Sequence, residues 1–133
     1  MKVFSKNNFM IHSLVPRDYK YGCNVHVTND FTEATNGHYL IRVYCRNEDK
    51  ARIPETENLK PSEEKIDVPI SADSAREIER TIPKNQSIET LNSAWIGKNT
   101  NENQVEFICT DLETWRPIIV KKMEGKFAPT ESV

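Results

Sequence analysis

The stretch Ala34–Leu40 constrains the fold of this chain most, because Asn36 and Gly37 stand between two runs rich in strand-forming residues. Asn-Gly is typical of a tight turn between antiparallel strands, since both residues tolerate positive φ. The upstream residues alternate apolar with polar, and the downstream residues are mostly β-branched or aromatic. The sequence therefore predicts three antiparallel strands over residues 23–46, with a further turn at Asn29-Asp30.

The clearest helix is predicted over residues 71–82. Ser71 is a favoured N-cap residue, and Pro83 ends the helix. Apolar residues recur at helical spacing and form one stripe that must lie on a sheet; they are Ala72, Ala75, Ile78 and Ile82. By contrast, residues 1–21 predict only one short strand or one turn of helix, because Pro16 and its charged neighbours interrupt any longer element.

The second half is predicted to be mostly β structure. A short strand at 66–70 precedes the helix, and alternating runs follow it at 87–91, 94–97, 104–109 and 114–120. Pro117 favours an edge position for the last strand. Residues 47–65 are highly charged and contain two prolines, which predicts a long solvated connection, either a plain crossover or a partner contact. Together these elements predict one α+β domain over residues 1–133.

Composition restricts the class of protein. Charged residues make up 29% and hydrophobic residues 37% of the chain, which suits a soluble globular domain. No apolar run approaches the roughly 20 residues of a membrane-spanning helix, and no signal-peptide core follows Met1, so a cytoplasmic protein with no membrane role is expected. A net charge of -2 excludes a generally basic nucleic-acid binder but allows a local basic face.

The residues that commonly perform chemistry form no familiar pattern. The three cysteines are isolated and lie in strand-like runs, so we expect buried, reduced thiols. The three histidines have no ligand-like spacing, which predicts no metal and no cofactor. No nucleophile motif or phosphate-binding glycine loop is present, so a non-enzyme is predicted. The residues concerned are Cys23, Cys45, Cys109, His12, His26 and His38.

Two segments resemble the bacterial sliding clamps, the β subunits of DNA polymerase III. Ala-Thr-Asn-Gly-His-Tyr-Leu at 34–40 is similar to the Ala-Thr-Asp-Gly-His-Arg-Leu of that family. Glu-Gly-Lys-Phe-Ala-Pro at 124–129 resembles the family's Asp/Glu-Gly-Arg/Lys-Phe-Pro segment, which closes the middle clamp domain. Val68-Pro69-Ile70 before the helix is similar to the clamp's strand-to-helix step. The resemblance, which covers residues 25–133, implies a DNA-clamp-like domain built from two βαβββ units, whose first helix is here short or missing.

The resemblance implies two sites. In the family, helices on the inner face of a ring hold duplex DNA through its phosphates, a role that Arg76, Arg80 and Lys84 match here. Asp73, Glu77 and Glu79 dilute this charge, and a plain solvated face is the alternative. The family also binds partner peptides in an apolar pocket, and the matching residues are Thr35, Gly37, His38, Tyr39, Leu40, Pro129 and Val133.

The expected function is that of a non-catalytic clamp-like accessory in DNA replication or repair, which binds clamp-binding peptides of replication or repair proteins and contacts duplex DNA as a homo-oligomer. The alternative is a clamp-derived protein-interaction module, of a phage or mobile-element type, with no DNA role. Six clamp domains close the family's ring, so one-domain chains would have to pair their sheet edges. Since Val133 falls inside a family motif, the sequence also allows a fragment of a longer clamp.

Overall fold

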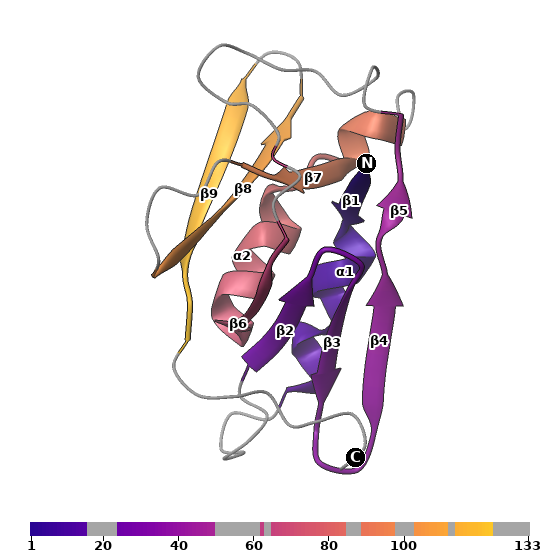
Figure 1. Ribbon diagram of the computed structural model, residues 1–133, viewed down its shortest axis with the longest axis vertical. Coiled ribbons are helices and arrows are strands. Elements are labelled where there is room, and N and C mark those ends of the chain that lie inside the picture. Colours follow the sequence, from indigo (N-terminus) through magenta and orange to yellow (C-terminus); the bar gives the residue numbers. More distant parts are fainter. Residues whose placement is uncertain are drawn as a thin grey trace.

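A computed structural model describes residues 1–15, 24–49, 62, 65–84, 89–97, 103–111 and 114–123. Within this part of the chain, the protein has two antiparallel sheets and two α-helices (Figure 1). The predicted α+β class is therefore confirmed. No helix of the described part is long and apolar enough to cross a membrane.

The order of a strand, a helix and then further strands occurs twice along the chain. The first half contains β1 (Lys2–Ser5), α1 (Lys6–Met10), the 3-10 helix η1 (Ile11–Leu14), β2 (Asn24–Thr28), β3 (Phe31–Thr35), β4 (Leu40–Tyr44) and β5 (Arg46–Asn47). The second half contains β6 (Asp67–Ser71), α2 (Ala72–Thr81), the 3-10 helix η3 (Glu89–Asn92), β7 (Ser93–Ile96), β8 (Gln104–Thr110) and β9 (Trp115–Lys121). The described elements thus form two similar units, which the residues themselves do not show as a repeat.

Each unit gives its first strand to the sheet of the other unit. The five-stranded sheet has the order β5-β1-β7-β8-β9, and Phe4 of β1 pairs with Ala94 of β7. The four-stranded sheet has the order β4-β3-β2-β6, and Val25 of β2 pairs with Ile70 of β6. In Figure 1, β4 and β5 follow one long side of the molecule and β9 follows the opposite side. Neither unit therefore completes its sheet alone.

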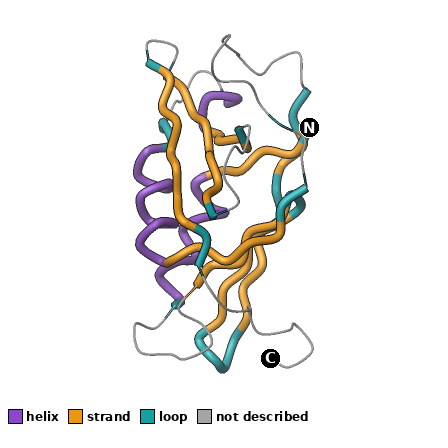
Figure 2. The backbone as a smooth tube through the Cα atoms, turned by 60° about the vertical axis from the view of Figure 1, so that its left-hand side comes forward, coloured by secondary structure: helices purple, strands orange, loops and turns teal. Residues whose placement is uncertain are grey.

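The core lies between the sheets and the helices. The two α-helices pack against each other, and Figure 2 shows them on one side of the molecule with the sheets across from them. Ala75, Ile78 and Ile82 of the predicted α2 stripe are buried in this core. The rings of Phe4, Phe9 and Phe107 meet there with centroids 5.4–5.6 Å apart, a spacing at which aromatic rings attract each other.

The helix α2 confirms its prediction closely. Ser71 lies at the N-cap and its Oγ accepts a hydrogen bond from the Ser74 backbone N–H at 3.0 Å. The helix ends at Thr81, and Ile82 is its C-cap residue, directly before Pro83. This cap and this proline are local signals, which explains why the sequence alone locates the helix.

The N-terminal segment is richer than the prediction of one short strand or one turn of helix. Strand β1, helix α1 and the 3-10 helix η1 follow one another without a break. Asn8 explains this, because its buried side chain accepts a hydrogen bond from the Ser5 backbone N–H at 2.9 Å and donates one to the Val43 carbonyl at 2.9 Å. The helix of the first unit, expected to be short or missing, is present but short, with five residues.

Other expectations have mixed outcomes. The strands predicted around the Asn36-Gly37 turn, before α2 and at 94–97, 104–109 and 114–120 are present, and β9 with Pro117 is an edge strand as predicted. The strand predicted at 87–91 is wrong over residues 89–91, which belong to the 3-10 helix Glu89–Asn92, whereas residues 87 and 88 lie outside the described residues. Cys45 and Cys109 are buried, free thiols as predicted, whereas Cys23 lies outside the described residues.

Candidate functional site

The β3–β4 hairpin forms the wall that the family resemblance assigns to a peptide pocket. Thr35 pairs with Leu40, and the loop between them has four residues rather than the two of a tight Asn-Gly turn. Gly37 has a φ of 91°, which a residue with a Cβ rarely adopts. The Asn36 Oδ1 accepts hydrogen bonds from the backbone N–H groups of His38 and Tyr39, both at 2.9 Å.

Thr35 stabilises the loop through side-chain hydrogen bonds to two backbone groups of the loop. Its side chain is buried, and its Oγ1 donates to the Tyr39 carbonyl at 2.7 Å and accepts from the Gly37 backbone N–H at 3.0 Å. The sequence Thr-Asn-Gly therefore builds the loop through two side chains that satisfy backbone groups, which is the usual reason for such residues in turns. This hydrogen bonding sets the direction of the residues that follow Gly37.

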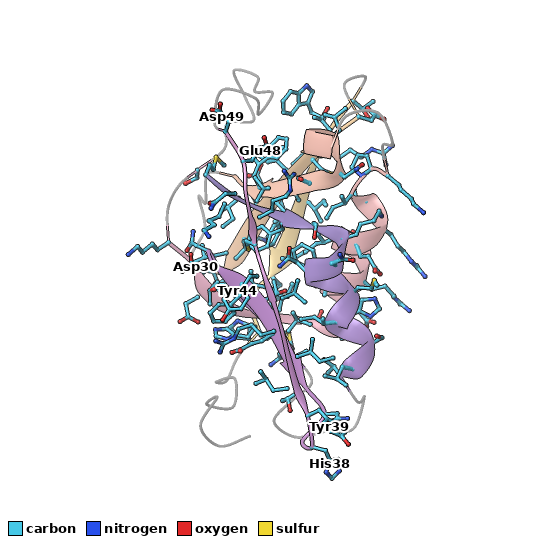
Figure 3. The ribbon with its side chains drawn as sticks, turned by 90° about the vertical axis from the view of Figure 1, so that its right-hand side faces the viewer. Asp30, His38, Tyr39, Tyr44, Glu48 and Asp49 are labelled. Atoms are coloured by element: carbon cyan, nitrogen blue, oxygen red, sulfur yellow. The ribbon has the colours of Figure 1, made fainter. Side chains whose placement is uncertain are left out.

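The loop presents His38 and Tyr39 to solvent. Figure 3 shows both side chains at the tip of the hairpin, and Tyr39 is 70% exposed. Leu40 is half-buried next to them. The structure thus brings five of the predicted pocket residues together on one hairpin, whereas Pro129 and Val133 lie outside the described residues.

The three cations predicted to contact DNA lie on or just after α2. Arg76, Arg80 and Lys84 are all exposed, and the two arginines lie on the side of α2 away from its buried stripe. The Arg76 guanidinium lies 3.5 Å from the Asp73 carboxylate, in an exposed pair that contributes little to stability. These cations therefore lie together on the helical side of the molecule, with acidic residues among them.

Helix α1 and the 3-10 helix η1 contribute two more basic groups to that side. The Lys6 ammonium donates a hydrogen bond to the Glu79 carbonyl at 2.5 Å, and His12 Nε2 lies 3.1 Å from the Glu79 carboxylate. These contacts tie the first helical segment to α2. The sequence did not indicate them, because they join residues that lie far apart in the chain.

A line of charged side chains crosses the outer face of the four-stranded sheet, one from each strand. In spatial order they are Asp67 on β6, His26 on β2, Glu33 on β3 and Arg42 on β4. The distance from Asp67 Oδ1 to His26 Nε2 is 2.5 Å, that from His26 Nδ1 to Glu33 Oε1 is 2.8 Å, and that from Glu33 Oε2 to Arg42 Nη2 is 2.8 Å. Arg42 also lies with its Cζ 4.0 Å from the centre of the Phe31 ring, and hydrogen bonds to Tyr44 and then to Glu33 raise the pKa of its guanidinium.

We call this line Asp67–His26–Glu33–Arg42 the charge ladder. Sequence reasoning missed it, although a signal was present: the alternation of β2 and β3 places Val25 and Val27 in the core and hence His26 on the opposite face. Knowing which strands are neighbours was the missing information, because β6 joins this sheet from the second unit.

A cavity of about 510 Å³ opens beside the charge ladder. It lies between the start of β1, the β2–β3 turn and the residues that lead into β6, and Asp67 is shared between its wall and the ladder. The lining is mixed in charge and polarity and consists of Met1, Lys2, Thr28, Asn29, Asp30, Ser62, Lys65, Ile66, Asp67 and Ile96. This cavity is separate from the β3–β4 loop, since it includes none of the predicted pocket residues.

Neither of the described sites has the donor set of a metal centre. Within the described ranges, no group of three or more His, Cys, Asp or Glu side chains is placed to hold a metal ion. The two described cysteines are poor nucleophiles, because burial raises the pKa of Cys45 to about 12 and that of Cys109 to about 11.

Comparison with known proteins adds no assignment. No protein-family model, curated protein or solved structure matches the chain.

Proposed function

We propose that this protein is a non-catalytic, DNA-clamp-like accessory of DNA replication or repair. The observation that carries the proposal is the pair of strand-helix-strand units that exchange their first strands and lay both helices on one side. A clamp domain, as the sequence resemblance implies it, consists of two βαβββ units with two helices on one face, and the two units described here support the proposal. The short α1 departs from it, because the family's inner face carries two long helices.

The helical side is the surface proposed to contact duplex DNA. Arg76, Arg80 and Lys84 are exposed there, and phosphate contacts by such cations do not depend on base sequence. About three neutralised phosphates give a weak, salt-sensitive contact, so a single copy holds DNA poorly. Assembly of several copies would multiply the contact.

Self-association is proposed through β4 and β9, two of the four strands that end a sheet within the described part of the chain. The strands β4 and β9 end their sheets on opposite sides of the molecule (Figure 1). Exposed apolar side chains lie on both, with Tyr44 67% and Ile119 59% exposed. Unpaired edges of this kind accept another strand. Sedimentation velocity over a range of protein concentrations measures this directly, and a monomer at every concentration contradicts it.

The DNA proposal is tested by fluorescence anisotropy with a labelled duplex, using both the native and a chemically crosslinked protein. We expect binding that weakens as salt rises, and that falls further in Arg76→Ala/Arg80→Ala. Lys121→Ala is the matched control, since this exposed cation lies on β9 next to the buried Val120 and on the opposite face of that strand. If the crosslinked protein shows no affinity at low salt, the DNA role is excluded.

The second candidate is a protein-interaction module without a DNA role. The observation that favours it is the acidic content of α2, where Asp73 pairs with Arg76 and Glu79 contacts His12. These carboxylates weaken the attraction of the helical side for phosphates. Peptide binding by the β3–β4 hairpin without DNA binding is the result that this candidate predicts.

A further inference from the structure

The charge ladder contains a histidine that faces carboxylates on both sides. His26 Nδ1 lies 2.8 Å from Glu33 Oε1, and His26 Nε2 lies 2.5 Å from Asp67 Oδ1. Ionised carboxylates only accept hydrogen bonds. In this arrangement both ring nitrogens therefore donate, and the imidazole carries a positive charge.

The imidazole, and not either carboxyl group, carries the protons of these two hydrogen bonds, because the surroundings of Glu33 and of Asp67 favour an ionised carboxylate. Glu33 accepts two hydrogen bonds from Arg42 on its other oxygen, at 2.9 Å from Nε and 2.8 Å from Nη2. Asp67 has a side chain that is 78% exposed, so water solvates its charge. The signs along the ladder then alternate, and all neighbouring charges attract each other.

The two hydrogen bonds of His26 are unequal when one proton is removed. The Glu33 side chain is only 3% exposed, and a buried carboxylate that loses a donor finds little water to replace it. When the exposed Asp67 carboxylate loses its donor, the cost is smaller, because solvent water replaces the hydrogen bond. A neutral His26 ring therefore keeps its Nδ1–H on Glu33 and releases Asp67.

We propose that the charge ladder is a proton-controlled clasp between β2 and β6, closed when His26 is charged and open at the Asp67 end when it is neutral. Glu33 on β3 and Asp67 on β6 both face His26, and Arg42 on β4 lies behind Glu33. The consequence reaches the cavity, because its lining includes Asp67, the first residue of β6, and Lys65 and Ile66 directly before it. This regulation goes beyond the proposed binding roles and does not depend on them.

The test is hydrogen exchange of the β6 backbone amides at about pH 5.5 and about pH 8, the range in which histidines change charge. Rates are corrected for the intrinsic effect of pH and compared with those of β8, in the other sheet. We expect the β6 amides to exchange about threefold faster at the higher pH, the scale of one ion pair with an exposed partner. Equal ratios of β6 to β8 rates at both pH values overturn the proposal.

Three variants make the test specific. Asp67→Asn removes the exposed carboxylate, leaves the Glu33–Arg42 pair intact and should abolish the pH dependence. His26→Gln keeps a donor without a titratable charge and should abolish it too. His12→Gln should leave it unchanged, because His12 pairs with Glu79 on the helical side. Persistence of the effect in folded Asp67→Asn contradicts the clasp even if His26→Gln does not fold.

Discussion

Asn8 is a polar residue in the core, and its amide holds three separate elements in place. It bonds the Ser5 backbone N–H at the start of α1, the Thr32 hydroxyl on β3 and the Val43 carbonyl on β4. A buried amide with all its partners stabilises one arrangement, whereas an apolar side chain would leave those partners unpaired. This explains why a short helix persists at a place where the local sequence predicts little.

We expect Asn8→Ala to lower the free energy of unfolding by about 2 kcal/mol, since it removes the partner of the part-buried Ser5 N–H and Val43 carbonyl. Urea denaturation measures this loss. The neighbouring Asn7→Ala is the control, because Asn7 is exposed and its removal should change stability by less than about 0.5 kcal/mol. Equal losses in the two variants would show that the Asn8 hydrogen bonds are not what matters.

The buried thiols predict a loss of stability at alkaline pH. Cys45 has a pKa of about 12 in the folded protein, because burial disfavours the thiolate, against an ordinary value of 9.0. Below pH 9 the thiol is protonated in both states, and above it the unfolded chain releases the proton first. The thiol contribution is thus complete below pH 9 and is lost as the pH rises toward 12.

The free energy of unfolding of the wild type should therefore fall relative to that of Cys45→Ala across this alkaline range. Chemical denaturation of both proteins at several pH values gives the difference. Comparison with a variant removes the contributions of lysines and tyrosines, which titrate in the same range. A difference that stays constant with pH would mean that the thiolate is not excluded from the fold.

At the scale of elements, local signals located α2 and the β3–β4 hairpin, and tertiary contacts decided the rest. Ser71, Pro83 and the Asn36-Gly37 pair act within a few residues of themselves, so their effect is visible in the sequence. The helix α1 depends on hydrogen bonds from Asn8 to residues far along the chain, and the charge ladder depends on the contact of His26 with Asp67. Neither is visible as a local sequence pattern. Five of the seven predicted pocket residues lie on the hairpin, and their role in peptide binding stays a prediction, as it does for Pro129 and Val133, which lie outside the described residues.

Leu40 tests the hairpin as a binding wall. We expect Leu40→Asp to weaken binding of a clamp-binding peptide by about tenfold or more, because a charge replaces an apolar anchor contact. Isothermal titration calorimetry measures the affinity. Gln104→Asp places the same charge on an exposed position of β8 and should bind like the wild type. Unchanged affinity in folded Leu40→Asp removes this wall from the proposed function.

For the whole molecule, the exchange of β1 and β6 predicts a single unfolding transition. Each sheet contains a strand from the other unit, so neither unit can unfold and leave its partner intact. Trp95 and Trp115 report on the five-stranded sheet, and their rings lie 6.3 Å apart. Tryptophan fluorescence and the hydrogen exchange of β2 and β3 should give the same midpoint in denaturant. Separate midpoints would show that the two sheets unfold independently.

The strand exchange also determines when folding can finish. Phe4 of β1 cannot form its native pair until Ala94 of β7 is in place, and Val25 of β2 cannot form its native pair until Ile70 of β6 is in place. Such distant partners give a high contact order, which slows folding because a long loop must close before its contacts form. During synthesis, β1 leaves the ribosome long before β7, and until then β5 is its only native partner strand among the described elements. Joining the two units in this way therefore lengthens the time during which the nascent chain exposes incompletely paired strands, which are prone to aggregate.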